Sequence, residues 1–190
     1  MALRALTASF IVLVSVVTAG SQSWKNTAPE SFNATGQILG STAGVASSID
    51  IKIDRYTSDA DHTVLVAAIK SGGHAAFVEA LRKAPQVGTV TIGDRSVAVR
   101  WARQQPQGQD RRVAVVTDQP VFFFGGGALD AKPTAGFDVA LVEFTIDSVG
   151  LGKGTMAPAA HLKPGGAIGV EVEDYAGKRV TLTTVRRNMS

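Results

Sequence analysis

The chain has 190 residues, 45% of them apolar, with 19 basic and 16 acidic side chains and no cysteine. This length and composition fit one globular domain with a sizeable core. The small positive charge is scattered along the chain, which argues against nucleic acid or an anionic membrane as a partner. The lack of cysteine excludes a disulfide framework and lipid attachment through a thiol.

The N-terminus has the layout of a secretory signal peptide. Arg4 precedes an apolar run from Ala5 to Val17, and small residues follow at Ala19–Ser21, where we expect cleavage. The run is shorter than the roughly 18 residues of a spanning helix, so we expect no stable membrane insertion after cleavage, and an uncleaved anchor is the alternative. The expected organisation is a signal peptide over 1–20, a linker over 21–30 and a single β-barrel-like domain over 31–190.

One part of the chain changes from strand to helix periodicity. Ile49, Ile51 and Ile53 alternate with polar residues, which predicts a half-buried strand over Val45–Arg55, after a shorter one at Phe32–Gln37. Ser58 with Asp61 then resembles a capping box. Gly72-Gly73 and Pro85 each end a helical stretch. These signals predict a two-helix hairpin at about 58–84, packed outside a sheet.

After Pro85 the apolar residues recur with period two. Short turns such as Gly93-Asp94 separate the strands, and Pro158 requires an edge or a bulge. We expect about eight to ten strands, too many for one flat open sheet. The predicted fold is therefore mainly β, an antiparallel meander barrel with a small helical insertion. The expected strands are Val87–Ile92, 95–103, Arg112–Thr117, Val121–Phe124, Gly136–Ile146, Gly154–Leu162, Ile168–Glu173 and Val180–Thr184.

The strand at Gly136–Ile146 is apolar on both faces, so it should be covered on both sides. Glu143 is the one charge inside it, and a buried carboxylate must be paired or protonated. Arg100 and Arg103 are the expected partners. The pair is either an internal ion pair of the barrel or an anchor for the head group of a ligand.

No motif specifies a reaction. His62, His74 and His161 lack metal-ligand spacing, and no Gly-x-Ser-x-Gly elbow is present. The glycine-rich segment 150–155 lacks the Gly-Lys-Ser/Thr order of a phosphate loop, and no helix is expected after it. We therefore predict no catalytic residue, no metal site and no cofactor.

Aromatic residues supply the candidate ligand contacts. Phe122 and Phe124 share one side of a short strand beside Gly125-Gly126-Gly127, where they either pack in the core or form an exposed apolar patch. Inward-facing aromatic residues could line a cavity. The candidate ligand-binding residues are Trp101, Phe122, Phe124, Phe137, Arg100 and Glu143.

Several segments together resemble a group of secreted bacterial proteins of unknown function. They are IKIDRYTSDAD at 51–61, VRWARQQP at 99–106, VVTDQPVFF at 115–123 and VEDYAGKRVTLTTVRR at 172–187. The resemblance implies a bacterial protein that is periplasmic or secreted, and it implies no activity or site residues. The Gly-x-Trp signature of lipocalins is absent, because Gln22-Ser23 precede Trp24.

The leading hypothesis from the sequence is a non-enzymatic exported barrel that binds a small apolar or amphipathic ligand. One alternative is an envelope scaffold or protein-interaction module that uses the patch at Phe122–Phe124 or an edge strand, with an unknown protein partner. The other is a barrel-type enzyme that uses Glu143 with Arg100 or Arg103.

Overall fold

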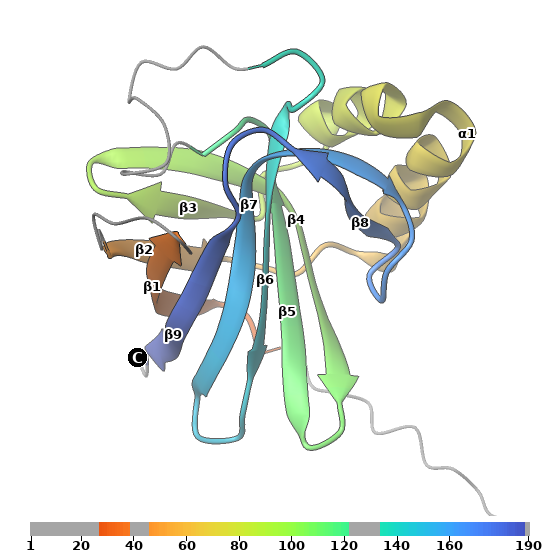
Figure 1. The fold of residues 1–190 in the computed structure, drawn as a ribbon. Coiled ribbons are helices and arrows are strands. Elements are labelled where there is room, and N and C mark those ends of the chain that lie inside the picture. The colour runs from red at the N-terminus through yellow and green to blue at the C-terminus, as the bar shows by residue number, and fades with distance from the viewer. Residues whose placement is uncertain (1–26, 39–45, 122–133, 189–190) are drawn as a thin grey trace, which may run out of the picture.

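The computed structural model describes residues 27–38, 46–121 and 134–188 (Figure 1). The predicted signal peptide and most of the predicted linker lie outside these residues. The described part of the chain forms strands and one helix in the order β1 (Glu30–Ile38), β2 (Ser47–Ile53), α1 (Asp59–Lys83), β3 (Gly88–Ile92), β4 (Arg95–Gln107), β5 (Asp110–Thr117), β6 (Val139–Ile146), β7 (Leu151–Pro164), β8 (Val170–Tyr175) and β9 (Val180–Asn188).

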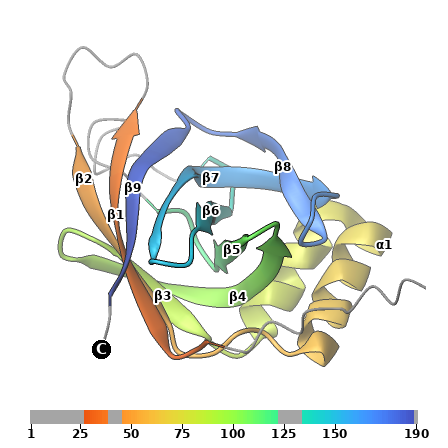
Figure 2. The same cartoon turned by 90° about the horizontal axis from the view of Figure 1, so that it is seen from below.

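The strands close into an eight-stranded antiparallel barrel, which confirms the predicted fold class. Neighbours from β1 to β7 pair in sequence, and β9 closes the barrel by pairing with both β7 and β1. β8 is the exception to the meander. It pairs with residues 160–164 of β7, whereas β9 pairs with residues 151–156 of the same strand. Figure 2 looks into the barrel, with α1 against its outer wall.

The molecule has two apolar cores, one on each side of the barrel wall. The inner core fills the barrel with aliphatic side chains and the Phe32–Phe144 ring pair. The outer core lies between the wall and α1, where Leu65, Phe77 and Leu81 of the helix are buried. Burial of this apolar surface is what holds the helix on the barrel.

Helix α1 is one element with a break, so the predicted two-helix hairpin is wrong. Gly73 takes φ 68° and ψ −159°, which bends the helix without a connecting loop. The predicted start is confirmed, since Ser58 caps the helix and accepts from the Asp61 backbone N–H at 3.1 Å. By length and hydropathy alone α1 could cross a membrane, yet its buried side chains pack on the barrel.

Strand β6 is covered on both faces, as its sequence predicts. Ala140, Val142 and Phe144 face the inner core, while Val139 and Leu141 face α1 in the outer core. Two-sided burial explains why β6 lacks the polar alternation of its neighbours.

A β-bulge in β4 reverses the side-chain alternation of that strand. The register with β5 shifts between Val99 and Trp101, so Arg100 is the extra residue. Val99 before the bulge and Ala102 after it both face the inner core, and Trp101 faces outward. A second shift, where β7 pairs with β6, lies at Pro158–Ala159, which confirms that Pro158 occupies a bulge.

Candidate ligand site at one end of the barrel

The structure does not gather the six predicted ligand-binding residues into one site. Trp101 lies under α1, with its ring centroid 5.8 Å from that of Phe77 and 5.5 Å from that of His62. Its expected place inside the barrel is wrong, because the bulge at Arg100 turns it outward. Phe137 contacts the His161 ring outside the barrel. Phe122 and Phe124 lie outside the described residues.

Glu143 faces outward from the wall, and its expected partners are engaged elsewhere. Arg100 pairs with Asp118 at 2.9 Å, and Arg103 pairs with Asp59 at 2.9 Å. Burial raises the pKa of Glu143, although the nearby charges of Arg112 and Arg179 oppose the shift. The predicted pairing of Glu143 with Arg100 or Arg103 is therefore wrong, because both arginines pair with other carboxylates and strand β5 separates β4 from β6.

One end of the barrel is closed by a buried charge cluster that the sequence analysis missed. Arg111 donates from Nη1 to Glu30 Oε1 at 2.7 Å and from Nη2 to Glu30 Oε2 at 2.9 Å. The Tyr56 hydroxyl donates to the same carboxylate, and the Gln104 carbonyl accepts from Arg111 at 2.6 Å. The side chains of Glu30 and Arg111 are 2% and 6% exposed. Such a network leaves little room for an apolar guest at this end.

The hydrogen bonds of this cluster outweigh the effect of burial on Glu30. Burial alone raises the pKa of that carboxyl, but the bonds from Arg111, Tyr56 and Thr27 together hold it below its ordinary value. Burial and the Glu30 charge raise the pKa of Tyr56, so it stays a neutral donor. The alternation Val115, Val113, Arg111 could have revealed an inward arginine, had the strand been extended one residue toward the turn.

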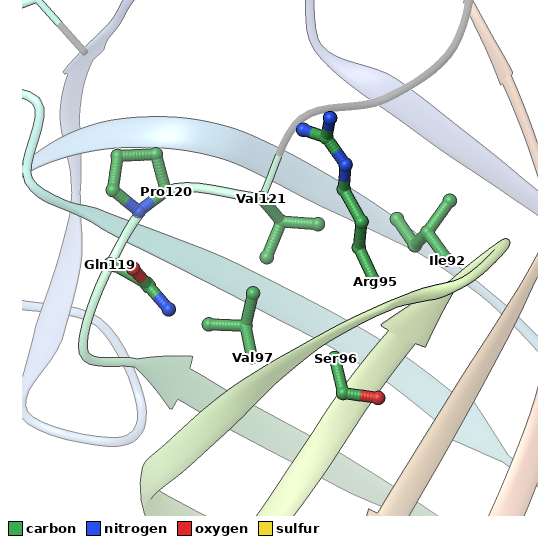
Figure 3. A pocket seen from close by; sticks show the side chains of 7 residues that line it. All are labelled: Ile92, Arg95, Ser96, Val97, Gln119, Pro120 and Val121. Carbon is green, nitrogen blue, oxygen red and sulfur yellow. The ribbon is translucent and has the colours of Figure 1, made fainter. Parts of the chain in front are cut away.

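The opposite end of the barrel carries an open recess of about 300 Å³ (Figure 3). Ile92, Val97 and Val121 belong to the inner core and form the apolar part of its lining. In Figure 3 the side chains of Val97 and Val121 point toward the same space, and Arg95 rises beside them. Arg95, Ser96, Gln119 and Pro120 complete the described lining.

The segment that forms one wall of the recess is held in place by hydrogen bonds. The Thr117 hydroxyl donates to the Gln119 carbonyl at 2.6 Å, and the Val121 N–H donates to the Pro158 carbonyl at 2.8 Å. Asp118 pairs with Arg100 at 2.9 Å. The wall is therefore preformed, which is usual for small-molecule sites.

The recess brings together residues that are distant in the sequence, which is why no motif revealed it. Ile92 and Arg95 flank the β3–β4 turn, whereas 119–121 follow β5. Among the predicted residues that the structure describes, only Arg100 acts here, as a support for Asp118 and not as a lining residue. Comparisons with protein-family models, with curated proteins and with solved structures each found no match.

Proposed function

We propose that the protein is an exported, non-enzymatic barrel that binds a small amphipathic molecule with an acidic head group at its open end. The observation that carries the proposal is the recess where Ile92, Val97 and Val121 continue the inner core to the surface. A preformed hollow with an apolar floor and a few polar groups is the usual form of a ligand site. A volume of about 300 Å³ suits a short chain or a single ring.

The rim favours an acidic head group. Its seven described lining residues include one cation, Arg95, and no carboxylate. A guanidinium matches a carboxylate in shape and donates two parallel hydrogen bonds to it. Ser96 and Gln119 add a hydroxyl and an amide that can donate to the same group.

The inner core favours binding at the end of the barrel over binding in its middle. The side chains of the barrel interior pack into one buried cluster, as is common in eight-stranded barrels. The Glu30–Arg111 cluster closes the other end with charged groups. A ligand in the recess therefore contacts the apolar interior without displacing core side chains or the buried charge cluster.

The N-terminal sequence pattern and the resemblance to secreted bacterial proteins support export to the periplasm or beyond. The interaction-module hypothesis is the second candidate, and it depends on the patch at Phe122–Phe124, which lies outside the described residues. We place it second, since it lacks an observation comparable to the recess.

The test begins with mass spectrometry of small molecules retained by the purified protein. Decanoate, decanol and decylamine are then compared as displacers of a fluorescent fatty acid. We expect decanoate to bind most tightly, because its head group can pair with Arg95. Equal binding of all three would remove the acidic head group from the proposal.

Two pairs of variants assign the binding to the recess. Gln119→Trp places a large side chain at the exposed rim and should weaken the binding of decanoate about tenfold or more. Gln107→Trp, at the opposite end of the barrel, should leave this binding unchanged. Arg95→Gln should weaken the binding of decanoate about fivefold and leave the binding of decanol unchanged. The exposed control Arg186→Gln should leave the binding of both compounds unchanged. If Gln119→Trp and Gln107→Trp bind alike, the recess is not the site.

A further inference from the structure

His74 lies beside the bend in helix α1, with its side chain buried against the barrel. It directly follows Gly73, the residue at which α1 bends, and its side chain is 4% exposed against the barrel wall. A glycine at positive φ is the natural hinge of a bent helix. A contact made by the next residue fixes how the second half of α1 sits on the barrel.

A hydrogen bond to strand β7 determines the proton position on His74. The Leu162 backbone N–H donates to His74 Nδ1 at 3.0 Å. Nδ1 is therefore an acceptor, and the neutral ring carries its proton on Nε2. Nε2 is buried without a hydrogen-bond partner and lies 3.6 Å from Asp138 Oδ2.

This arrangement excludes two common roles for a buried histidine. A metal ligand or a general base must present a nitrogen lone pair to its partner. The one lone pair of the neutral ring already accepts the Leu162 N–H. The geometry thus leaves a structural contact whose strength depends on the charge of the ring.

Charged and titratable groups face His74 from each element around it. From β7, the His161 ring stacks on it with centroids 4.2 Å apart. Asp138 precedes β6 and also approaches Arg82 of α1, with Oδ1 3.8 Å from Nη2. Glu173 of β8 lies 3.5 Å from His161 Nε2. These groups connect α1 to three segments of the wall.

A second proton on His74 would break the contact with β7. It must bind at Nδ1, where the ring would then present a donor to the donor of Leu162. Two buried donors cannot satisfy each other, so the charged ring must leave this position. Its departure frees the helix immediately after the hinge at Gly73.

We propose that the neutral His74 ring holds the second half of α1, residues 74–83, on the barrel and releases it in acid. We call this pH-dependent contact the latch. At neutral pH the ring accepts from Leu162 and the segment is docked. In acid the charged ring leaves the wall, and the segment pivots at Gly73. Phe77, Val78 and Leu81 are buried in the docked state and become accessible. The latch is independent of the proposed ligand.

The direction of the pH effect follows from the surroundings of the ring. Burial, and then His161, lower the pKa of His74 below its ordinary value of 6.5, while Asp138 and Glu173 oppose the shift. A histidine with a depressed pKa leaves the docked state at full stability above about pH 6.5. That stability is lost as the pH falls toward the docked-state pKa.

Hydrogen exchange followed by mass spectrometry tests the latch on the intact protein. Between pH 7 and pH 5, after correction for the intrinsic rates, we expect exchange in 74–83 and at Leu162 to accelerate about tenfold or more. Strands β1 and β2 should not change. An acceleration spread evenly over all strands, or none at all, would overturn the proposal.

Two histidine variants separate the latch from general acid effects. His74→Asn keeps a carbonyl oxygen near the place of Nδ1 and cannot titrate, so its exchange should not respond to pH. His161→Asn retains His74, so the response should remain but be smaller, because loss of the neighbouring charge brings the docked-state pKa of His74 closer to its ordinary value. A response that survives in His74→Asn, or disappears in His161→Asn, contradicts the assignment.

A measurement on the unmodified chain covers the case in which His74→Asn fails to fold. Nitrogen NMR of the imidazole rings should show His74 with its proton on Nε2 at pH 7. Its titration midpoint should coincide with the acceleration of exchange in 74–83. A His74 proton on Nδ1, or a midpoint far from the exchange transition, would refute the mechanism.

Discussion

Replacing Glu30 with Gln tests whether the charge cluster holds the closed end of the barrel. The substitution keeps the side-chain shape but leaves the Arg111 guanidinium buried without its carboxylate. Breaking a buried ion pair by removing one partner costs about 3–5 kcal/mol. A domain is stable by only about 5–15 kcal/mol, so the expected loss is a large part of the total.

The structure places this variant within that range for three reasons. The Glu30 side chain is 2% exposed, so water cannot replace the lost charge. Both of its oxygens accept from Arg111, which makes the pair bidentate. The Tyr56 hydroxyl also donates to it and would face an amide in the variant. The Arg111→Met variant should lose a similar amount, because it leaves Glu30 uncompensated.

Urea unfolding followed by circular dichroism at pH 7 measures these losses. The double variant Glu30→Met with Arg111→Met should be more stable than either single variant, because no buried charge remains. Glu79→Gln is the matched control, since its pair with Lys83 is exposed and should contribute little. A loss below about 1 kcal/mol in Glu30→Gln would show that the pair is solvated, and would refute the reasoning.

The same variant predicts a dependence on pH. The pKa of Glu30 in the folded protein lies below its ordinary value of 4.5. A carboxyl with a lowered pKa stabilises the fold above that ordinary value and loses its effect as the pH falls through the folded-state pKa. The stability gap between the native chain and Glu30→Gln should therefore narrow in acid.

Two further substitutions test the barrel wall. Gly88→Ala would place a methyl group 2.1 Å from the Lys52 carbonyl oxygen, so we expect a loss of about 1–3 kcal/mol in urea unfolding, and an unchanged midpoint would contradict the close β2–β3 approach. Glu143→Gln should raise the Tm at pH 7 and have no such effect below pH 4.5, because the raised pKa of Glu143 means that its charged form costs stability as the pH rises. A lower Tm at pH 7 would show that Arg112 and Arg179 outweigh burial.

The fold class could be predicted because the side-chain period of a strand is local information. The two-sided apolar pattern of β6 implied cover on both faces, and the structure provides the inner core and α1. The capping residue Ser58 and the bulge at Pro158 were also predictable, since each depends on a few adjacent residues.

Whether the site residues of β4 point into or out of the barrel could not be predicted, because one extra residue in the strand reverses the direction of the side chains that follow. The bulge at Arg100 places Trp101 outside the barrel and Ala102 inside. Strict alternation from Val97 gives the opposite result. A bulge of this kind depends on the pairing with β5, which the sequence of β4 alone does not contain.

The helix break shows a similar limit. Gly72-Gly73 reads as a helix end, because glycine favours the left-handed backbone that terminates helices. In the structure the chain bends at Gly73 and continues as helix, since the apolar residues on both sides of it pack on the same wall. Tertiary burial thus outweighs the local stop signal.

Arg100 physically connects the proposed ligand recess to the end of helix α1. Its Nη1 donates at 2.9 Å to the carbonyl of Ala84, the residue that ends α1, and its Nε pairs with Asp118 behind the recess wall. The guanidinium reaches both groups because the bulge places Arg100 between them. A helix released at His74 would still be tethered to the barrel by the hydrogen bond from Arg100 to Ala84.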